Sequence, residues 1–418
     1  MFYIEEFTVE NLAGRPEVLK RKLDRSTNIF WGLNGRGKTT LMSIINLALH
    51  NKTTEINRLP FTSASIVLRS DDLHIRIVRS FKKSRDNSMP EIDDDPSDEF
   101  SLSSDSSSPD EFIVPEFNDD QDSWFDSYET IDENGNVDRE IRGPISRRPR
   151  VAHMYLPITR ISEGILSRFP VHTRDPRHRE SDADHVDLRF VNQVKRAWSF
   201  YNSKSNAKIR DVQQEGLAEV LAILFGGPVL DYLDRSAQIK SDDSYDLVKS
   251  FLAENNIDLQ ISKMTFIERY EESQEHRAVV GKIEEVRNKV DTILRPQKEL
   301  QNVIDQMFIG NKHLVFNKSQ QRIGRPFSDS IEITVDGSSI PLWALSSGEK
   351  QLLQLLLQVL SAGQSIVMID EPEISLHVDW QERIVNSMRR INPDAQLLLT
   401  THSPEIMVHI EDDCVFEL

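Results

Sequence analysis

The 418-residue sequence contains a single cysteine, Cys414, and no long hydrophobic run. One cysteine cannot form an internal disulfide or, by itself, a thiolate metal site, so we expect an ordinary buried residue in the last strand. The absence of about 18 consecutive apolar residues excludes a conventional membrane-spanning helix. The first residues carry Glu5, Glu6 and Glu10 in place of the basic and apolar pattern of an export signal. We therefore expect a cytoplasmic protein without a membrane partner.

Lysine and arginine are missing from one long stretch. Between Glu91 and Asp138 there are 18 acidic and no basic residues, which accounts for the whole net charge of −18. Residues 82–145 are rich in Ser, Asp, Glu and Pro and cannot bury enough apolar surface to order themselves. They predict an acidic, mostly disordered insert, in which Asn134-Gly135 indicates one hairpin.

The segment after this insert has the opposite charge. Ten arginines and three acids lie between Arg139 and Arg179. We interpret residues 146–181 as an arginine-rich segment that returns to the core with a strand at Val151–Leu156. Two interpretations of these arginines stay open. They bind an anionic partner, or they neutralise the acidic insert, which would then mask them, or form solvated surface.

The remaining segments predict an α/β core that a long insertion interrupts. Residues 1–81 begin with β-prone segments, and residues 311–418 alternate between helix and strand. Residues 182–310 between them have helical periodicity, with helices expected near 186–201, 209–225 and 244–254.

The last part of the helical insertion has the most regular pattern. Apolar residues from Ile283 to Met307 follow a heptad spacing, which is broken at Gln297 and at Pro296, where we expect a kink. A segment of about 25 residues predicts a short helical arm of ~37 Å. A packed helical lid is the alternative.

A glycine-rich turn follows the apolar segment Asn28–Trp31 and precedes a predicted helix that starts at Lys38. The turn fits the pattern G-x-x-x-x-G-K-[ST]. In this pattern the glycines let backbone N–H groups surround phosphates, the lysine reaches the β and γ phosphates, and the hydroxyl ligates Mg²⁺. The candidate phosphate-binding residues are Asn34, Gly35, Arg36, Gly37, Lys38, Thr39 and Thr40, of which Thr39 is also a candidate metal ligand.

Two carboxylates follow a second apolar segment, Ile366–Ile369. Such a run is typical of a buried parallel strand, which delivers polar residues to its carboxyl end. Asp370 is then a candidate ligand of the Mg²⁺ shell, and Glu371 is a candidate catalytic residue that orients the attacking water. The alternative is a core strand that ends in two helix-capping acids.

The residues Leu345-Ser346-Ser347-Gly348-Glu349-Lys350 precede a strongly apolar helix, where their hydroxyl and N–H groups surround its N-terminus. A capping box is one interpretation. The order of the motifs favours another, because the chain resembles the ABC-type ATPase superfamily, in particular its SMC, RecF and OLD-like branch. In that branch a signature close to L-S-G-G-E/Q stands before the acidic strand, and this sequence has Ser347 at the first glycine.

Two further segments resemble the same superfamily in the same order. Residues 371–377 resemble the D-loop, and Leu399-Thr400-Thr401-His402-Ser403-Pro404 resembles the switch-histidine strand. The resemblance covers roughly residues 1–80, 150–160 and 330–418. It implies an α/β fold, a P-loop NTPase head of ABC type with a mixed sheet, flanking helices and a mainly helical insertion. A glutamine expected in the segment Tyr155–Arg160 is absent.

The resemblance also implies a composite site for ATP and Mg²⁺. Lys38, Glu371 and His402 are then the catalytic residues of one copy. The second copy supplies its signature, Ser346, Ser347, Gly348 and Glu349, across the nucleotide. The protein is therefore expected to form a homodimer or a higher even-numbered homo-oligomer.

Relatives of this kind predict a regulatory ATPase that controls a separate effector protein, for example a nuclease, in bacterial antiphage defence. The alternative is a DNA-repair or chromosome-maintenance ATPase like RecF or SMC that binds DNA directly, and contact with nucleic acid stays open. A transporter subunit is disfavoured, because Ser346 lies 308 positions after Lys38 and no membrane segment is present. We also do not expect a self-contained OLD-like nuclease, because only 16 residues follow His402 in this sequence.

Overall fold

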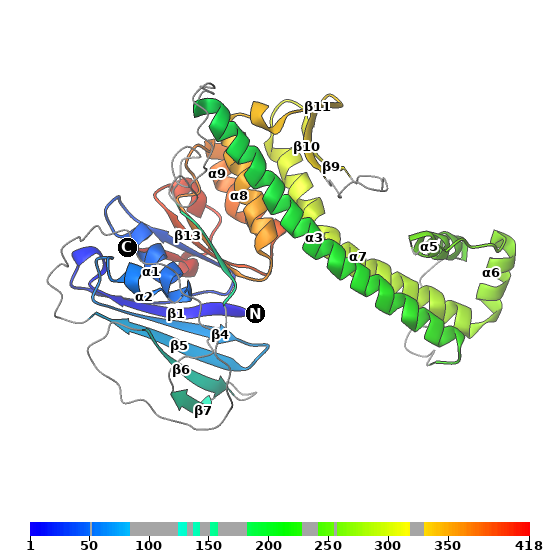
Figure 1. The fold of residues 1–418 in the computed structure, drawn as a ribbon, viewed down its shortest axis with the longest axis horizontal. Helices are drawn as coiled ribbons and strands as arrows, with labels where there is room; N and C mark the ends of the chain where they lie inside the picture. The colour runs from blue at the N-terminus through cyan, green and yellow to red at the C-terminus, as the bar shows by residue number, and fades with distance from the viewer. Residues whose placement is uncertain are drawn as a thin grey trace, which may run out of the picture. The chain divides into compact units, whose positions relative to one another are not determined.

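The computed structural model describes residues 1–50, 52–83, 124–131, 137–142, 151–157, 182–227, 241–254, 257–317 and 330–418. They divide into two compact units (Figure 1). The first comprises Met1–Ile158, Gln364–Glu371 and Gln396–Leu418, and the second comprises Thr159–Gly363 and Pro372–Ala395. Within the described ranges, no helix is both long enough and apolar enough to span a bilayer.

Unit 1 contains a six-stranded antiparallel sheet with the strand order β2-β1-β4-β5-β6-β7. Phe7 and Val9 of β1, two positions apart, are both fully buried on one face of the sheet. The strands are β1 (Phe2–Glu10), β2 (Val18–Lys22), β4 (Ser63–Ser70), β5 (Ile75–Lys82), β6 (Trp124–Ile131) and β7 (Val137–Arg142).

The predicted hairpin in the acidic insert is present, since β6 and β7 pair antiparallel and β6 also pairs with β5. Part of residues 82–145 is therefore an ordered extension of the sheet. The hairpin turn and residues 84–123, which hold most of the predicted disordered segment, lie outside the described residues. So do residues 143–150 and 158–181, which hold most of the arginine-rich segment.

A second sheet in unit 1 is parallel throughout, with the order β14-β3-β13-β12-β8. Every residue of β12 and β13 is buried, as expected for strands covered on both faces. Its strands are β3 (Thr27–Trp31), β8 (His153–Leu156), β12 (Ile366–Asp370), β13 (Gln396–Thr401) and β14 (Val415–Glu417). The predicted α/β class is confirmed, although parallel and antiparallel strands form two sheets and not one mixed sheet.

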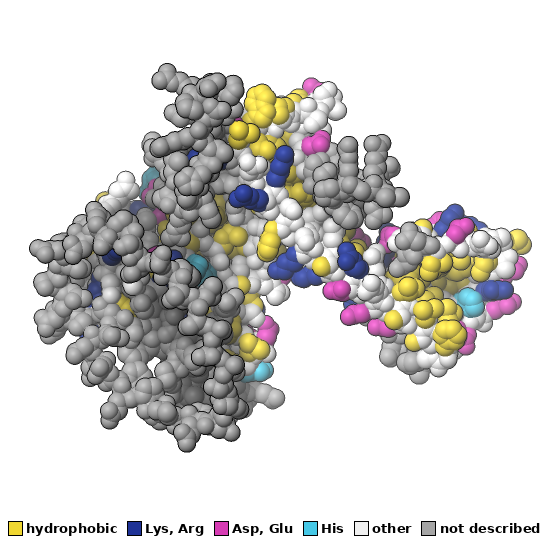
Figure 2. All heavy atoms as spheres, in the orientation of Figure 1, with side chains coloured by type: hydrophobic (Ala, Val, Ile, Leu, Met, Phe, Trp, Pro, Cys, Tyr) yellow, Lys and Arg dark blue, Asp and Glu magenta, His cyan; other side chains and the backbone are white. Residues whose placement is uncertain are grey.

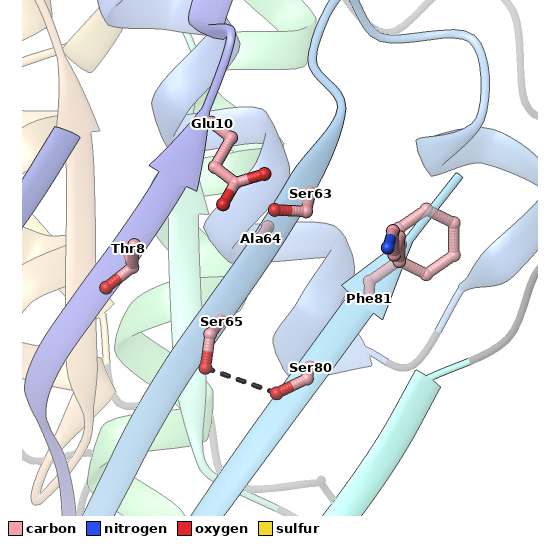
Figure 3. Close-up of a pocket in the computed structure, with 8 residues that line it drawn as sticks. Thr8, Glu10, Ser63, Ala64, Ser65, Ser80 and Phe81 are labelled. Atoms are coloured by element: carbon pink, nitrogen blue, oxygen red, sulfur yellow. Dashed lines mark hydrogen bonds between the residues drawn. The ribbon is translucent and has the colours of Figure 1, made fainter. Parts of the chain in front are cut away.

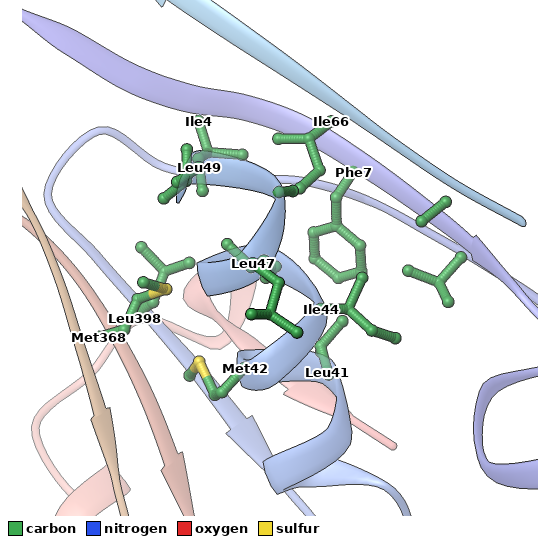
Figure 4. Close-up of a cluster of buried hydrophobic side chains, with 14 of the residues drawn as sticks. Ile4, Phe7, Leu41, Met42, Ile44, Leu47, Leu49, Ile66, Met368 and Leu398 are labelled. Carbon is green, nitrogen blue, oxygen red and sulfur yellow. The ribbon is translucent and has the colours of Figure 1, made fainter. Parts of the chain in front are cut away.

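Helix α1 (Lys38–His50) lies between the two sheets and joins their cores (Figure 4). Its apolar side chains meet Phe7 and Ile66 of the antiparallel sheet, and Met368 and Leu398 of the parallel sheet, in one buried cluster. Each fully buried side chain of this size contributes about 1.5–3 kcal/mol. The shorter helices of unit 1 are α2 (Thr53–Ile56), η1 (Leu12–Gly14), η3 (Pro404–Met407) and η4 (Asp412–Cys414).

The prediction that Cys414 is a buried residue of the last strand is wrong. Cys414 ends η4, directly before β14, and is only partly buried.

Unit 2 is built on two long helices, α3 (Asp182–Leu224) and α7 (Gln274–Met307), which lie side by side (Figure 1). The helices α5 (Ser241–Glu254) and α6 (Lys263–Glu272) pack at one end of the pair. At the other end are α8 (Ser347–Ala362), α9 (Val378–Ile391), η2 (Leu342–Ala344) and a three-stranded sheet. Its strands are β9 (Lys312–Asn317), β10 (Ser330–Val335) and β11 (Ser338–Ile340).

Two predictions for this unit are wrong in detail. The helices expected at 186–201 and 209–225 form one continuous helix, because the buried positions Trp198, Tyr201 and Ser205 keep helical spacing through the polar segment between them. The arm expected from about 25 residues is also longer, because helix α7 has 34 residues, includes Pro296 and extends ~51 Å.

The close packing of α3 against α7 explains their pairing. A Cβ at Gly216 of α3 would lie only 2.3 Å from a methyl group of Val286. Lys282 of α7 is nearly inaccessible and forms ion pairs with Glu219 of α3 and with Glu285. The helical insertion is therefore a packed hairpin.

Gln396 joins the two sheets of unit 1 through its side chain, which is fully buried. Its Nε2 donates to the backbone oxygens of Ile4 and Asp24, both at 2.8 Å, and its Oε1 accepts from the Ile4 N–H at 2.7 Å. The amide therefore satisfies three main-chain groups that lie far away in the sequence.

Replacing Gln396 by Ala should destabilise the protein by about 3 kcal/mol, because buried backbone groups that lose their partners each cost about 1–3 kcal/mol. Urea denaturation followed by circular dichroism measures this effect. Gln364→Ala, at an exposed position two residues before β12, is the control and should change stability by less than about 0.5 kcal/mol. Equal effects of the two substitutions would contradict this account.

Candidate functional site

The glycine-rich turn connects β3 to α1, as the sequence predicted. Gly35 and Gly37 have φ angles of 79° and 92°, which side chains disfavour. A Cβ at Gly37 would lie 3.1 Å from the Ala13 Cβ and 3.2 Å from the Leu12 Cγ, so η1 packs directly against the turn. Glycine is therefore required both by the backbone conformation and by the close neighbour.

Lys38 begins α1 and is 5% exposed. Its Nζ donates to the backbone oxygens of Gly32 at 2.8 Å and Leu33 at 3.4 Å, so the ammonium group is held inside the turn. The first main-chain bond of the helix runs from the Leu41 N–H to the Gly37 oxygen. Within the described residues, the N–H groups of residues 37–40 donate to no backbone oxygen. They are available to an anion at the helix N-terminus.

The other predicted residues of this turn are more accessible. Asn34, Gly35, Arg36 and Thr39 are exposed, while Thr40 is partly buried. Exposed backbone and hydroxyl groups next to a buried lysine are the donor set that phosphate oxygens require.

Asp370 and Glu371 lie at the carboxyl end of β12. Asp370 is 3% exposed, and its register partner in β13 is Thr400, whose Oγ1 donates to the Asp370 Oδ1. The N–H of Glu371 donates to the Thr400 oxygen at 3.0 Å. Glu371 has a φ angle of 50° and precedes Pro372, so its backbone is in a conformation that such residues rarely adopt.

His402 follows β13, the strand next to β12. Its Nδ1 is 3.6 Å from the Glu371 Oε1, and the two side chains are 49% and 15% exposed. The structure thus brings together two of the three predicted catalytic residues. They lie at the carboxyl edge of the parallel sheet. The glycine-rich turn follows β3 at the same edge.

Tyr155 of β8 was not predicted as a site residue. It pairs with Met368 of β12, and burial followed by the negative charge of Asp370 raises its pKa to about 12, against the effect of a hydrogen bond with the Ser43 side chain of α1. The sequence of this segment differs from the expected pattern in lacking a glutamine, and its residues 158–160 lie outside the described part. Tyr155 links the acidic strand to the helix that begins at Lys38.

The raised pKa of Tyr155 gives a pH dependence. In the unfolded chain the phenol ionises near its ordinary pKa of 10, whereas the folded protein holds the proton up to about pH 12. Folding therefore gains from this group below about pH 10, and the gain is lost as pH rises towards 12. Tyr155→Phe should cost about 1 kcal/mol at pH 7, because the hydrogen bond is lost. That difference should shrink or reverse by pH 12 in urea denaturation, and a constant difference would contradict the assignment.

The signature residues lie in unit 2, at the N-terminus of α8. Ser346 and Glu349 form a capping box, in which the Ser346 Oγ accepts from the Glu349 N–H at 3.3 Å and Glu349 Oε2 accepts from the Ser346 N–H at 2.9 Å. Ser346 and Ser347 are nevertheless exposed. The capping interpretation is therefore observed, and it leaves both hydroxyl-bearing residues accessible.

Glu349 is less accessible than a ligand-binding residue would be. Its Oε1 accepts from the Nζ of Lys312 at 2.7 Å, and its side chain is 6% exposed. Burial favours a higher pKa for Glu349, but the hydrogen bonds from Lys312 and Ser346 outweigh it and lower the pKa. No sequence pattern predicts Lys312 as its partner.

Gly348 packs against the segment that resembles the D-loop. A Cβ there would lie 2.8 Å from the Ser375 oxygen and 3.4 Å from the Trp380 ring. Ser375 has a φ angle of 65°, and the Gln381 side chain donates to the Leu376 oxygen at 3.0 Å. The signature glycine is thus explained by backbone packing inside unit 2.

Gly348→Ala tests this packing. Alanine favours a helix by up to about 1 kcal/mol over glycine, but the contact with a backbone oxygen should outweigh that gain and give a net loss of about 1–2 kcal/mol. Urea denaturation measures it, with Ser347→Ala at the exposed neighbour as the control. A Gly348→Ala variant that is more stable than the unmodified protein would show that the D-loop segment moves away from the new methyl group without a loss of stability.

A pocket of about 270 Å³ lies elsewhere in unit 1, on the antiparallel sheet (Figure 3). The hydroxyl groups of Ser65 and Ser80 are 3.2 Å apart in its wall. Its lining residues are Thr8, Glu10, Ser63, Ala64, Ser65, Ser80, Phe81 and Lys82. None of the predicted site residues lines it.

Part of the chain is similar to a family of AAA domains. Residues 221–408 match the family model described as "AAA domain, putative AbiEii toxin, Type IV TA system". The retron Vc95 probable ATPase of Vibrio cholerae serotype O1 biovar El Tor is 25% identical over 297 residues, which cover 66% of this chain and 52% of that protein. The chain therefore spans about half the length of that relative.

Two further relatives match over shorter segments. The retron Ec83 probable ATPase of Escherichia coli is 28% identical over 103 residues, which cover 21% of this chain and 19% of that protein. The Septu protein PtuA of Bacillus thuringiensis is 36% identical over 44 residues, which cover 10% of this chain and 11% of that protein. The AAA domain and the two probable ATPases confirm the resemblance to ABC-type ATPases that the ordered motifs predicted.

Solved structures of Smc heads are also similar. The Smc head domain of Pyrococcus furiosus with an extended coiled coil, bound to the C-terminal domain of ScpA, has a TM-score of 0.39 and 13% identity, covering 97% of this chain and 91% of that chain. An SmcHead bound to the C-winged helix domain of ScpA has a TM-score of 0.42 and 12% identity, with the same coverage.

Proposed function

We propose that this chain binds and hydrolyses ATP as an ABC-type ATPase. One observation carries the proposal. The parallel order β3-β13-β12 brings the buried Lys38, the Asp370 carboxylate and the Glu371–His402 pair to the carboxyl ends of adjacent strands. Ligands of open α/β sheets bind at this edge. The matches to an AAA domain and to probable ATPases support the same activity.

The residues of unit 1 have distinct roles in this proposal. The turn of residues 34–37 surrounds the phosphates, the N–H groups of residues 37–40 bind them, and Lys38 neutralises the β and γ phosphates. Glu371 orients the attacking water, and His402, beside it, donates to the γ phosphate. The 3.6 Å separation of these two side chains supports a shared function.

Thr39 and Asp370 are the proposed ligands of Mg²⁺. Among the described residues, no group of three or more His, Cys, Asp and Glu side chains is arranged to hold a metal ion. This agrees with Mg²⁺ chemistry, because the ion is commonly held by one or two protein oxygens together with substrate phosphates and water. When bound, it neutralises charge on the β and γ phosphates.

The second half of the proposed site comes from another copy of the chain. Ser346, Ser347 and Gly348 at the exposed N-terminus of α8 cover the nucleotide of a partner, with Glu349 fixing the geometry of that N-terminus. Hydrolysis then requires a head-to-tail homodimer or a higher even-numbered oligomer. Residues 1–81 and 311–418 form the head, and residues 82–145, 146–181 and 182–310 are inserted into it.

The proposed biological role is the control of a separate effector protein, such as a nuclease, in bacterial defence inside the cytoplasm. The names of the relatives support it, since two belong to retrons and one to Septu. Binding of ATP joins two copies and hydrolysis separates them. The presence of the γ phosphate therefore determines whether the effector is restrained or released.

Glu371→Gln should bind ATP, hydrolyse it about 10²–10⁴-fold more slowly, and accumulate as a dimer, because water activation is lost while the phosphate cradle is kept. Size-exclusion chromatography with light scattering, in ATP and Mg²⁺, and a phosphate-release assay measure both effects.

Glu382→Gln, the same chemical change at an exposed position of α9, is the matched control and should behave like the unmodified protein. Lys38→Ala should lose ATP binding and stay monomeric. A Glu371→Gln variant that hydrolyses ATP at the normal rate, or stays monomeric with ATP and Mg²⁺, would refute the proposed roles.

A further inference from the structure

Helix α3 has an uneven distribution of charge along its length. Residues 188–210 contain six basic and no acidic residues, whereas residues 211–224 contain three acidic and no basic residues. The basic residues are Arg189, Lys195, Arg196, Lys204, Lys208 and Arg210. A run of +6 in a chain with a net charge of −18 is a local excess that the average composition conceals.

All six basic side chains are exposed, because the helix buries its opposite side. The buried residues recur every three or four positions and pack into unit 2: Phe190, Val194, Trp198, Tyr201 and Ser205. The outer side presents Arg189, Arg196 and Arg210 together with Ser199, Ser203 and Asn206, and the three exposed lysines lie along its margins. Dark blue side chains are visible along this part of the molecule (Figure 2). We call this outer side of residues 189–210 the basic face.

The cations of the basic face are not neutralised within the described part of the chain. None of the six forms an ion pair with a described residue, whereas Lys289 and Lys298 of α7 pair with Glu285 and Asp291. A Cβ at Gly363, which caps the C-terminal end of α8, would lie 3.4 Å from the Nζ of Lys204. Six charges spread over ~32 Å of helix therefore face solvent.

An aromatic residue lies within this face. Phe200 is 62% exposed, although an apolar ring in a monomer normally turns inward. It is followed four residues later by Lys204 and preceded four residues earlier by Arg196, so it shares their side of the helix. Exposed rings between cations form the platform on which unpaired bases stack while the cations hold the phosphates.

We propose that the basic face binds single-stranded nucleic acid. The cations and the Ser and Asn side chains contact phosphates, and Phe200 stacks on a base. An acidic protein partner fits less well, because protein interfaces usually have an apolar centre and this face offers one ring. The inference does not depend on ATP binding.

Binding of the full chain to a fluorescent 30-nucleotide oligo-dT, and to a duplex of equal length, tests the proposal by anisotropy between 50 and 200 mM salt. The logarithm of the affinity should fall linearly with that of the salt concentration, by about 0.7 per phosphate contacted on a single strand. The triple variant Arg189→Gln, Arg196→Gln, Arg210→Gln should bind at least about tenfold more weakly at 50 mM salt and lower the slope by about 2. Phe200→Ala should weaken oligo-dT binding about tenfold and duplex binding much less.

A triple variant on α7 removes the same charge elsewhere and is the matched control: Arg287→Gln, Lys289→Gln, Lys298→Gln. It should keep its affinity. ATP binding and thermal unfolding of both triple variants should be unchanged, which separates this proposal from the ATPase proposal. No binding of oligo-dT at 50 mM salt, an equal loss in the control, or a preference for poly-glutamate over oligo-dT would overturn it.

Discussion

The parallel pairing of β3, β13 and β12 is the constraint on which the candidate site depends. These strands come from opposite ends of the chain, and their register sets Asp370 beside Thr400 and Thr401 beside Trp31. Because parallel strands end at a common edge, the turn after β3, the carboxylate after β12 and the imidazole after β13 reach one place. Helix α1 fixes this edge from behind, since its buried residues pack on both sheets.

Much of this arrangement could be predicted from the sequence. The motifs depend on local chemistry, such as glycine where φ is positive and an apolar run before two acids, and such patterns identify strand, turn and helix without tertiary information. The α/β class and the helical insertion followed from the same periodicities. The turn residues are exposed, as a phosphate-binding turn requires. Glu371 and His402 lie close together, as the resemblance predicted for two residues of one site.

The features that the sequence did not reveal depend on contacts between distant residues. Nothing local marks Lys312 as the partner of Glu349, Tyr155 as the neighbour of Asp370, or Gln396 as the link to β1. The continuity of α3 through a polar segment was missed for the same reason, because its buried side is defined by α7 and α8. Gly348 was read as a ligand position, while its packing on Ser375 explains the residue equally well.

The backbone of Glu371 has a consequence for catalysis. This residue is the last of unit 1, and Pro372 is the first of unit 2, so a strained torsion with a φ angle of 50° stands where the chain leaves one unit for the other. Such a conformation costs about 1–3 kcal/mol and persists only where neighbours impose it, here the bond from the Glu371 N–H to Thr400. The strained main chain thus fixes the direction of the carboxylate that we propose to orient the attacking water, and a rearrangement that relaxes the Glu371–Pro372 link would also turn this carboxylate away.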